Sequence, residues 1–413
     1  MLNRRTFIHQ LTGGAAALAG SSFLPSARVL GANDRVRFAL IGAGGRGHAI
    51  FRAALKAPNT EAVAVADVYT DRLNQMKQIV PNIQTYTEFR RVLDDKTIDA
   101  VLIATPQHQH ALNFVPAIQA GKDIYQEKTM AFNPEHARRM RRAFEGSGRI
   151  VQVGIQSVSG AAFRRAQELA TPERMGTITA IHAHHYRNAP YGGWRRKLPA
   201  DCTLQNVGWK DFEGEAAPHD FNPERFINWR FYWDYSGGNV FENMIHQVGF
   251  WYKALGLKIP RRVTMAGYNY FSPDMEVPDT MDVSMDQPEN LLFTWNSGFG
   301  NNYYGEDGHD LALGNKGTLL RVKENVSYLP QGGRHPATAP ESSATSGGAP
   351  DIVGGSDETN EHMQNFFECV RSRREPNCPF ELGYRSAVAC QMAIASLRQG
   401  RTVKWDAEAE DIV

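Results

Sequence analysis

The segment that decides the fold is Phe38-Ala-Leu-Ile-Gly42-Ala-Gly44-Gly45-Arg46-Gly47. Its apolar start is typical of a buried strand, and its glycines permit a tight turn in which a pyrophosphate can approach the backbone. A helix that begins in this turn directs its unpaired N–H groups and its positive dipole end at that phosphate. A second apolar run, Ala62–Ala66, ends on Asp67 about twenty residues beyond the glycines, where a carboxylate can bind the ribose hydroxyls of NAD. The segment therefore predicts a dinucleotide site; the alternative is a structural βαβ turn that binds nothing.

Asp67 also indicates which nucleotide is bound. A carboxylate at this position repels the 2′-phosphate of NADP, so Asp67 favours NAD. Arg46 and Arg72 are cations that soften this preference. We therefore expect NAD as the cofactor, with NADP less favoured.

The first 34 residues differ from the rest of the chain. Asn3-Arg4-Arg5-Thr6-Phe7 is a twin-arginine pattern, and the Ala- and Gly-rich run at 13–24 is too short and too weakly apolar to span a membrane well. Small residues typical of a cleavage site follow it. We expect residues 1–34 to be a twin-arginine signal and linker, removed from a periplasmic protein without a membrane span. A chance arginine pair on an amphipathic helix is the alternative.

Composition limits the class of protein. The chain has 413 residues, which suggests at least two domains, and its net charge of +1 argues against a nucleic-acid partner. Its four cysteines lack the CxxC spacing of a zinc site. An oxidising compartment permits a bridge from Cys369 to Cys378 or Cys390, but folding before export favours buried free thiols.

Residues 35–155 alternate apolar strands with helices, which predicts a Rossmann domain with a parallel sheet and helices on both faces. We expect further strands at 100–104, 122–126 and 149–153, and helices at 111–120 and 134–145. Ligands of such sheets bind beyond the carboxyl ends of the strands. Four polar residues lie at or just past such ends and should share one crevice: Asp67, Thr105, Lys128 and Gln156.

Residues 156–413 have a different texture. Strand-like runs at 177–186, 263–270 and 291–296 follow one another without a helix between each pair, which predicts an α/β domain with an open, largely antiparallel sheet. We expect a flexible loop at about 331–356, where Gly, Pro, Ala and Ser are frequent, and helices within 358–400.

Lys128 is the first candidate for chemistry. Glu127 and Lys128 follow a strand inside the expected crevice, where an ammonium can hydrogen-bond a substrate hydroxyl and ease the loss of its proton. A surface lysine at a strand end is the alternative.

Glu242 and His246 are the second candidates. Gly237-Gly238 predicts a turn that opens a helix, and residues four apart then share a helical face. A carboxylate beside an imidazole raises its basicity and fixes its orientation, which suits abstraction of a hydroxyl proton. A helix-surface ion pair is the alternative, and a metal pair would need a third ligand that we do not find.

The last candidates are histidines. His182 and His184 lie on one side of a predicted strand, a geometry that can bind a metal. We favour instead that they contact the substrate or belong to the core, because we expect this side of the sheet to face the cofactor. His110 is expected at a helix start near the nucleotide. We expect no metal, and substrate contacts from His184, Tyr186 and Arg230.

Together these motifs resemble the glucose–fructose oxidoreductase and inositol dehydrogenase family (Gfo/Idh/MocA) over nearly the whole mature chain. The turn at 42–47 is similar to its nucleotide loop, and Thr105-Pro106 with His110 to its TPxxxH segment. The run 120–128 resembles its AGKxxxxEKP signature, and 237–246 its GG…DxxxH segment. Two residues depart from the pattern: Thr129 replaces the proline, and Glu242, one methylene longer, replaces the aspartate.

The resemblance implies hydride transfer between NAD(P) and a sugar or cyclitol carbon, and an oligomer formed through the open sheet. By this resemblance Lys128 corresponds to the family lysine, and His246 corresponds to the family histidine that often accepts the proton. Arg46 would lie beside the phosphates of the nucleotide. With the residues above, the expected cofactor-binding set is Gly42, Gly44, Gly45, Arg46, Gly47, Asp67, Thr105, Pro106, His110, Glu127, Lys128 and Gln156.

Export affects the choice of function, because free NAD is scarce outside the cytoplasm. The leading hypothesis is a sugar oxidoreductase that holds and recycles its nucleotide. The alternative is an NAD-dependent glycoside hydrolase or lyase, in which transient oxidation of a hydroxyl acidifies the neighbouring C–H and allows elimination. A non-catalytic sugar or nucleotide sensor is the third possibility.

Overall fold

The computed structural model describes residues 35–189, 193–304, 309–332 and 357–413. The predicted export signal at 1–34 lies outside the described residues, as does nearly all of the predicted loop at 331–356.

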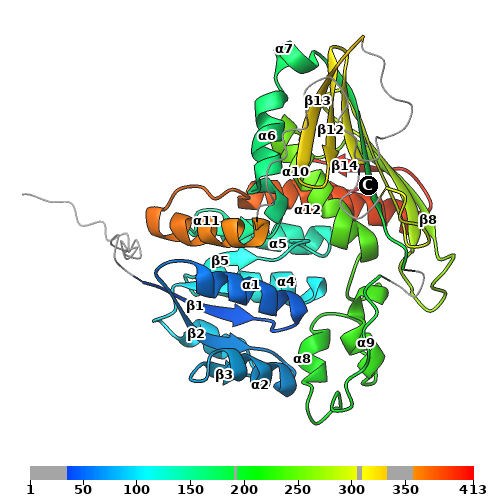
Figure 1. Ribbon diagram of the computed structural model, residues 1–413. Coiled ribbons are helices and arrows are strands. Elements are labelled where there is room, and N and C mark those ends of the chain that lie inside the picture. The colour runs from blue at the N-terminus through cyan, green and yellow to red at the C-terminus, as the bar shows by residue number, and fades with distance from the viewer. Residues whose placement is uncertain (1–34, 190–192, 305–308, 333–356) are drawn as a thin grey trace, which may run out of the picture.

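The N-terminal domain is the predicted Rossmann domain (Figure 1). Its six parallel strands lie in the order β3-β2-β1-β4-β5-β6, so the sheet reverses direction of growth between β1 and β4, beside the glycine turn. The strands are β1 (Val36–Ile41), β2 (Thr60–Ala66), β3 (Gln84–Tyr86), β4 (Ala100–Ile103), β5 (Asp123–Gln126) and β6 (Val151–Val153). The connecting helices are α1 (Gly45–Lys56), α2 (Thr70–Ile79), α3 (Arg90–Asp94), η1 (Gln107–Gln109), α4 (His110–Gln119) and α5 (Pro134–Phe144).

The second domain is built on a mixed, largely antiparallel sheet of nine strands, as expected. Among its internal pairs, β7 and β10 are parallel and the others are antiparallel. The strands are β7 (Ile178–Tyr186), β8 (Arg262–Tyr268), β9 (Thr280–Asp286), β10 (Leu292–Gly298), β11 (His309–Gly314), β12 (Gly317–Val322), β13 (Asn325–Pro330), β14 (Val403–Asp406) and β15 (Asp411–Ile412). The helices α10 (Ile245–Leu255) and α12 (Phe380–Gln399) cover one face of this sheet (Figure 1).

The remaining helices connect the two sheets. They are η2 (Gln156–Val158), α6 (Ala161–Leu169), α7 (Pro172–Met175), α8 (Trp209–Glu213), α9 (Pro223–Ile227), η3 (Trp229–Phe231), η4 (Val240–Met244) and α11 (Glu358–Ser372). The helices expected within 358–400 are α11 and α12.

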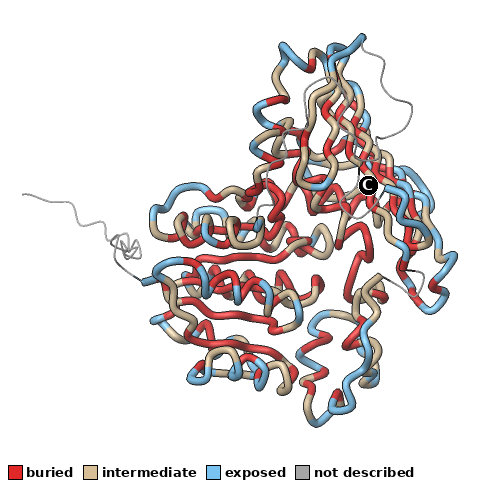
Figure 2. Tube along the Cα trace, viewed as in Figure 1, coloured by how far each residue is buried: buried red, intermediate tan, exposed pale blue. Residues whose placement is uncertain are grey.

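Helix α11 returns to the nucleotide-binding domain. It packs on α1, and the ring of Phe367 lies 5.4 Å from that of Phe38 on β1. The apolar face of α11 is buried there (Figure 2), in one cluster with β1 and α1. A division of the chain at residue 155 therefore separates segments that share a hydrophobic core.

All four cysteines are buried free thiols, as predicted. Among the described helices, none is both long and apolar enough to cross a membrane.

Candidate active site

The glycine turn forms one wall of a cavity of about 580 Å³. Its glycines serve different purposes. Gly42 has φ +92°, and a Cβ there would lie 2.6 Å from the backbone N of Thr105, while a Cβ on Gly47 would collide with the carbonyl of Gly42. These two residues are glycines because the turn packs closely on itself and on the end of β4.

Gly44 has no such internal reason. A Cβ there would meet no protein atom closer than 3.9 Å and would project into the cavity at the N-terminus of α1. Space over unpaired helix N–H groups fits a pyrophosphate. The turn is therefore suited to a dinucleotide. Besides Gly42, Gly44 and Gly45, four residues of the predicted cofactor-binding set line the same cavity: Arg46, Asp67, Thr105 and Pro106. Arg72, the second cation expected near Asp67, lines it too.

Asp67 ties β2 to the glycine turn. One carboxylate oxygen accepts a hydrogen bond from the backbone N of Ala43 at 2.6 Å, and the other from that of Tyr69 at 2.9 Å. Arg72 lies 3.5 Å away from the carboxylate, so the predicted cation is in place. The contact with ribose stays a prediction.

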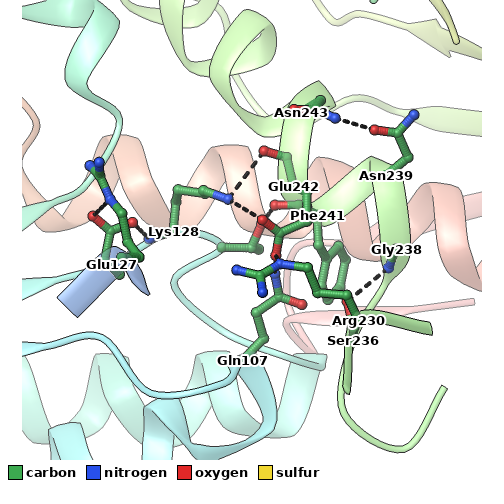
Figure 3. Close-up of polar contacts among 12 residues, drawn as sticks. Gln107, Glu127, Lys128, Arg230, Ser236, Gly238, Asn239, Phe241, Glu242 and Asn243 are labelled. Atoms are coloured by element: carbon green, nitrogen blue, oxygen red, sulfur yellow. Dashed lines mark hydrogen bonds and ion pairs between the residues drawn. The ribbon is translucent and has the colours of Figure 1, made fainter. Parts of the chain in front are cut away.

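Lys128 and Glu242 form the centre of the second group (Figure 3). The Lys128 ammonium donates to Glu242 Oε2 at 2.7 Å and to the Glu242 carbonyl at 3.2 Å. Arg230 Nε lies 3.1 Å from Glu242 Oε1, and Gln107 Nε2 donates to the same oxygen at 2.6 Å. Burial alone would raise the pKa of Glu242, but Arg230 and Lys128 outweigh it and lower that pKa to about 2. This carboxylate is therefore a fixed anion at neutral pH.

The predicted pairing of Glu242 with His246 is not found. Residues Val240–Met244 form a π-turn, which changes the angular offset between the two side chains, and Glu242 is occupied by the two cations. Glu242 does raise the basicity of His246, as expected, but other influences outweigh it. Burial, followed by the charges of Lys128 and Arg46, lowers the pKa of His246 well below 6.5. Neither ring nitrogen has a hydrogen-bond partner among the described residues, so a neutral imidazole is available to a ligand.

Glu127 organises a third contact group. It accepts from Arg46 Nε at 2.7 Å and from Gln156 Nε2 at 3.2 Å, and Gln156 also donates to the hydroxyl of Tyr125 at 2.7 Å. Burial opposes the charge of Arg46, but the carboxylate of Glu127 outweighs it and raises the Arg46 pKa. Glu127 thus joins Arg46 and Gln156 by accepting a hydrogen bond from each, and the contact of Arg46 with phosphate stays a prediction.

Thr129 and His110 shape the turn that carries Lys128. The hydroxyl of Thr129 donates to the carbonyl of Phe241 at 2.8 Å, which ties the turn to η4. The buried ring of His110 lies between the carbonyls of Thr129 and Thr105, 2.7 and 2.9 Å from its two nitrogens. His110 therefore supports the backbone of two site segments, and burial lowers its pKa.

His184 and Tyr186 do not join these groups. Along β7, Ile181, Ala183 and His185 are buried under the helices, whereas residues of the other parity lie on the open face. His184 hydrogen-bonds Asn296 at 2.7 Å and stacks on Tyr304, so the expectation that its face looks toward the cofactor is wrong. The apolar pair Ile181 and Ala183 was the signal that the other face is covered. No group of three His, Cys, Asp or Glu side chains in the described residues is placed to hold a metal.

Two contributors were missed. Gln107 had no distinguishing sequence signal beyond its place after Pro106. Arg196 lies in a segment that covers the cavity from the second domain, and no local pattern marked it. Arg230 pairs with Glu242 and also lines the cavity, and its expected contact with substrate stays a prediction.

Comparison with known proteins agrees with this geometry. Residues 36–155 match the model of the oxidoreductase family with an NAD-binding Rossmann fold, GFO_IDH_MocA. A glycosyl hydrolase family 109 protein of Stenotrophomonas maltophilia is 34% identical over 131 residues, 29% of this chain and 28% of its own length. Inositol 2-dehydrogenase 3 of Saccharopolyspora erythraea is 33% identical over 153 residues, 36% of this chain and 45% of its own length. The chain therefore spans less than half the length of these two curated relatives.

Solved structures share the fold. The WlbA dehydrogenase of Bordetella pertussis, in complex with NADH and UDP-GlcNAcA, has a TM-score of 0.67 at 19% identity, covering 90% of this chain and 98% of its own. A levoglucosan dehydrogenase in complex with NADH and levoglucosan has a TM-score of 0.69 at 16% identity, covering 90% and 99%. The family model and the relatives support the resemblance to the Gfo/Idh/MocA family, and residues 36–155 form an NAD-binding Rossmann domain.

Proposed function

We propose that this protein is an NAD(H)-dependent oxidoreductase that acts on a sugar or sugar derivative. The observation that carries the proposal is a lysine held by a buried carboxylate, with a neutral, unpartnered imidazole close enough for the lysine charge to lower its pKa. Relatives that are inositol dehydrogenases support the substrate class.

Bound nicotinamide would supply a carbon centre that accepts or returns a hydride. The residues of the chain then manage the proton. His246 is uncharged at neutral pH and can accept the proton of a substrate hydroxyl, while the Lys128 ammonium stabilises the negative charge that develops on the oxygen. Glu242, with Arg230 and Gln107, holds that ammonium in place. Seven of the residues that we expect to hold the nucleotide line the cavity at the glycine turn: Gly42, Gly44, Gly45, Arg46, Asp67, Thr105 and Pro106. Gly47, His110, Glu127, Lys128 and Gln156 do not line it, and their contact with the nucleotide stays a prediction.

A second candidate is glycoside cleavage by transient oxidation and elimination. It is supported by the 34% identity with the family 109 glycosyl hydrolase. Both reactions begin with removal of the same hydroxyl proton, so Lys128 and His246 have the same roles at that step.

One experiment tests the proposal and separates the candidates. The purified protein with NAD is screened on free sugars and aryl glycosides while nucleotide absorbance and aryl release are recorded. An oxidoreductase gives a substrate-dependent change in nucleotide redox state; a glycosidase releases the aryl group without net change. Lys128→Ala and His246→Ala should abolish either activity and keep nucleotide binding, while the matched control His184→Ala, on the open sheet face, should stay active. Unchanged function in both site variants would support the sensor hypothesis instead.

We also propose that the protein is exported by the twin-arginine route to the periplasm with its nucleotide bound, and that it forms a homo-oligomer. The pattern at Arg4 and Arg5 supports export. A nucleotide retained through each turnover would resolve the scarcity of free NAD there.

A further inference from the structure

The second domain sends a long segment over the nucleotide cavity. Residues 193–235, here called the cap, follow β7 and include α8, α9 and η3 (Figure 1). The cap docks just past Asp67: the backbone N of Thr70 donates to the carbonyl of Asn206 at 3.0 Å, and that of Gly208 donates to the carbonyl of Val68 at 2.8 Å. The hydroxyl of Tyr69 donates to Asp201 at 2.7 Å. The end of β2 and the cap are thus joined by backbone as well as side chains.

A second anchor holds the cap at the end of β4. Gln109 Nε2 donates to the carbonyl of Phe212 at 2.6 Å, and the buried His108 contacts the same oxygen at 2.6 Å. The aromatic core of the cap also includes a residue of the Rossmann domain, because the ring of Tyr69 packs edge-on against Phe226 at 5.7 Å. The cap is therefore fixed on both sides of the crevice in which the glycine turn lies.

Arg196 extends from the cap to the glycine turn. A Cβ on Gly45 would lie 3.1 Å from Arg196 Nη1, so the guanidinium stands directly over the N-terminus of α1. Asn228 fixes its backbone on both sides, accepting from the Arg196 N–H at 2.7 Å and donating to its carbonyl at 3.1 Å.

Arg196 is exposed, and no carboxylate in the described part of the chain lies within ion-pair distance of it. Partial burial and the charges of Arg230 and Arg72 lower its pKa, against the opposing charge of Glu242. A guanidinium placed against helix N–H groups, without an acidic partner, suits a ligand with two negative charges. The cavity that Arg196 lines also contains Gly44, where the protein leaves open space.

We propose that Arg196 binds the pyrophosphate of the nucleotide from the cap, so that the cofactor is held by both domains. This inference rests on nucleotide binding and not on which reaction follows. Because Arg196 and the glycine turn belong to different domains and would both contact the pyrophosphate, release of the nucleotide requires the Arg196 contact to break. Arg196 would thereby slow release of the nucleotide, which suits a protein that we propose to keep its cofactor after export.

The test is the dissociation constant of NADH, measured by its fluorescence with nucleotide-stripped full-length protein. Arg196→Gln should raise this constant at least tenfold, because it removes a charged hydrogen-bond donor. Arg196→Lys should raise it less, because the ammonium keeps the charge but loses the paired donors of the guanidinium. Arg401→Gln removes the same charge at an exposed residue that does not line the cavity, and should leave the constant unchanged. Adenosine, which lacks phosphate, should bind Arg196→Gln and the wild type equally.

The outcomes are distinct. Equal NADH affinity in Arg196→Gln and Arg401→Gln overturns the proposal while leaving nucleotide binding intact. Equal losses for NADH and adenosine in Arg196→Gln also overturn it, because they indicate a displaced cap rather than a lost phosphate contact. A wild-type chain that binds no NADH overturns both this proposal and the proposed function. The melting temperature of each variant establishes that it is folded.

Discussion

Replacing Glu242 by Gln should destabilise the protein markedly, because this carboxylate neutralises two cations in a confined space. The side chains of Lys128 and Arg230 are only 12% and 18% exposed, and Glu242 is 6% exposed. Glu242→Gln keeps the volume and one acceptor oxygen but removes the negative charge. Breaking a buried ion pair from one side costs about 3–5 kcal/mol. We expect the lower end, about 3 kcal/mol, because the amide oxygen can still accept from one cation.

The matched control is Asp286→Asn. Asp286 also lies between two arginines, with Arg261 at 2.9 Å and Arg262 at 2.8 Å, but these cations are 48% and 58% exposed. Exposed pairs contribute about 0–1 kcal/mol, so the same chemical change should have little effect. Differential scanning calorimetry of the two variants measures the difference, with an expected fall in melting temperature of roughly 3–4 °C for Glu242→Gln. Equal melting temperatures for the two variants would refute the assignment of Glu242 as the buried counter-ion.

Two further predictions concern stability. Burial, the largest cause in each case, lowers the pKa of His108 to about 4 and those of His185 and His362 to about 3. Below pH 6.5 the unfolded chain therefore binds protons that the folded chain does not. The free energy of unfolding should fall by roughly 3–4 kcal/mol for the three histidines together between pH 7.5 and pH 5.5. A melting temperature that does not change with pH over this range would contradict this prediction. Thr129→Val removes the hydrogen bond to the Phe241 carbonyl, which should lower the free energy of unfolding by about 1–2 kcal/mol and reduce turnover. Calorimetry and steady-state kinetics measure the two effects. Thr129→Ser keeps the hydroxyl and should retain most of the stability and turnover, whereas wild-type stability in Thr129→Val would count against the role of this hydroxyl.

The nucleotide-binding half could be predicted because its signals are local. The apolar run before Gly42, the glycine turn and Asp67 each constrain a few neighbouring residues, and together they fix a βαβ unit. The same holds for the strand ends at Thr105 and Lys128. The largely antiparallel second sheet was predicted because successive strand-like runs lacked intervening helices.

The errors arose where distant segments meet. The direction of the Glu242 carboxylate is decided by the π-turn before His246 and by the two cations that pair with it. A spacing of four residues in the sequence reveals neither the π-turn nor the cations. The docking of α11 on α1 joins ends of the chain that are far apart in sequence. The cap combines short helices with irregular backbone, so neither helical nor strand periodicity marked the segment that carries Arg196.

The central claim is that a nicotinamide nucleotide binds over the glycine turn. Gly44 offers a direct probe, because its conformation is extended and a side chain there meets only the open cavity. Asp is among the preferred residues at a helix N-cap, so Gly44→Asp should fold as well as the wild type while placing a carboxylate where the pyrophosphate must lie. NADH titration of the two nucleotide-stripped proteins should give about one nucleotide per chain for the wild type and a dissociation constant raised at least a hundredfold for Gly44→Asp, about 3 kcal/mol. Equal binding by both proteins, or none by the wild type, would contradict the account.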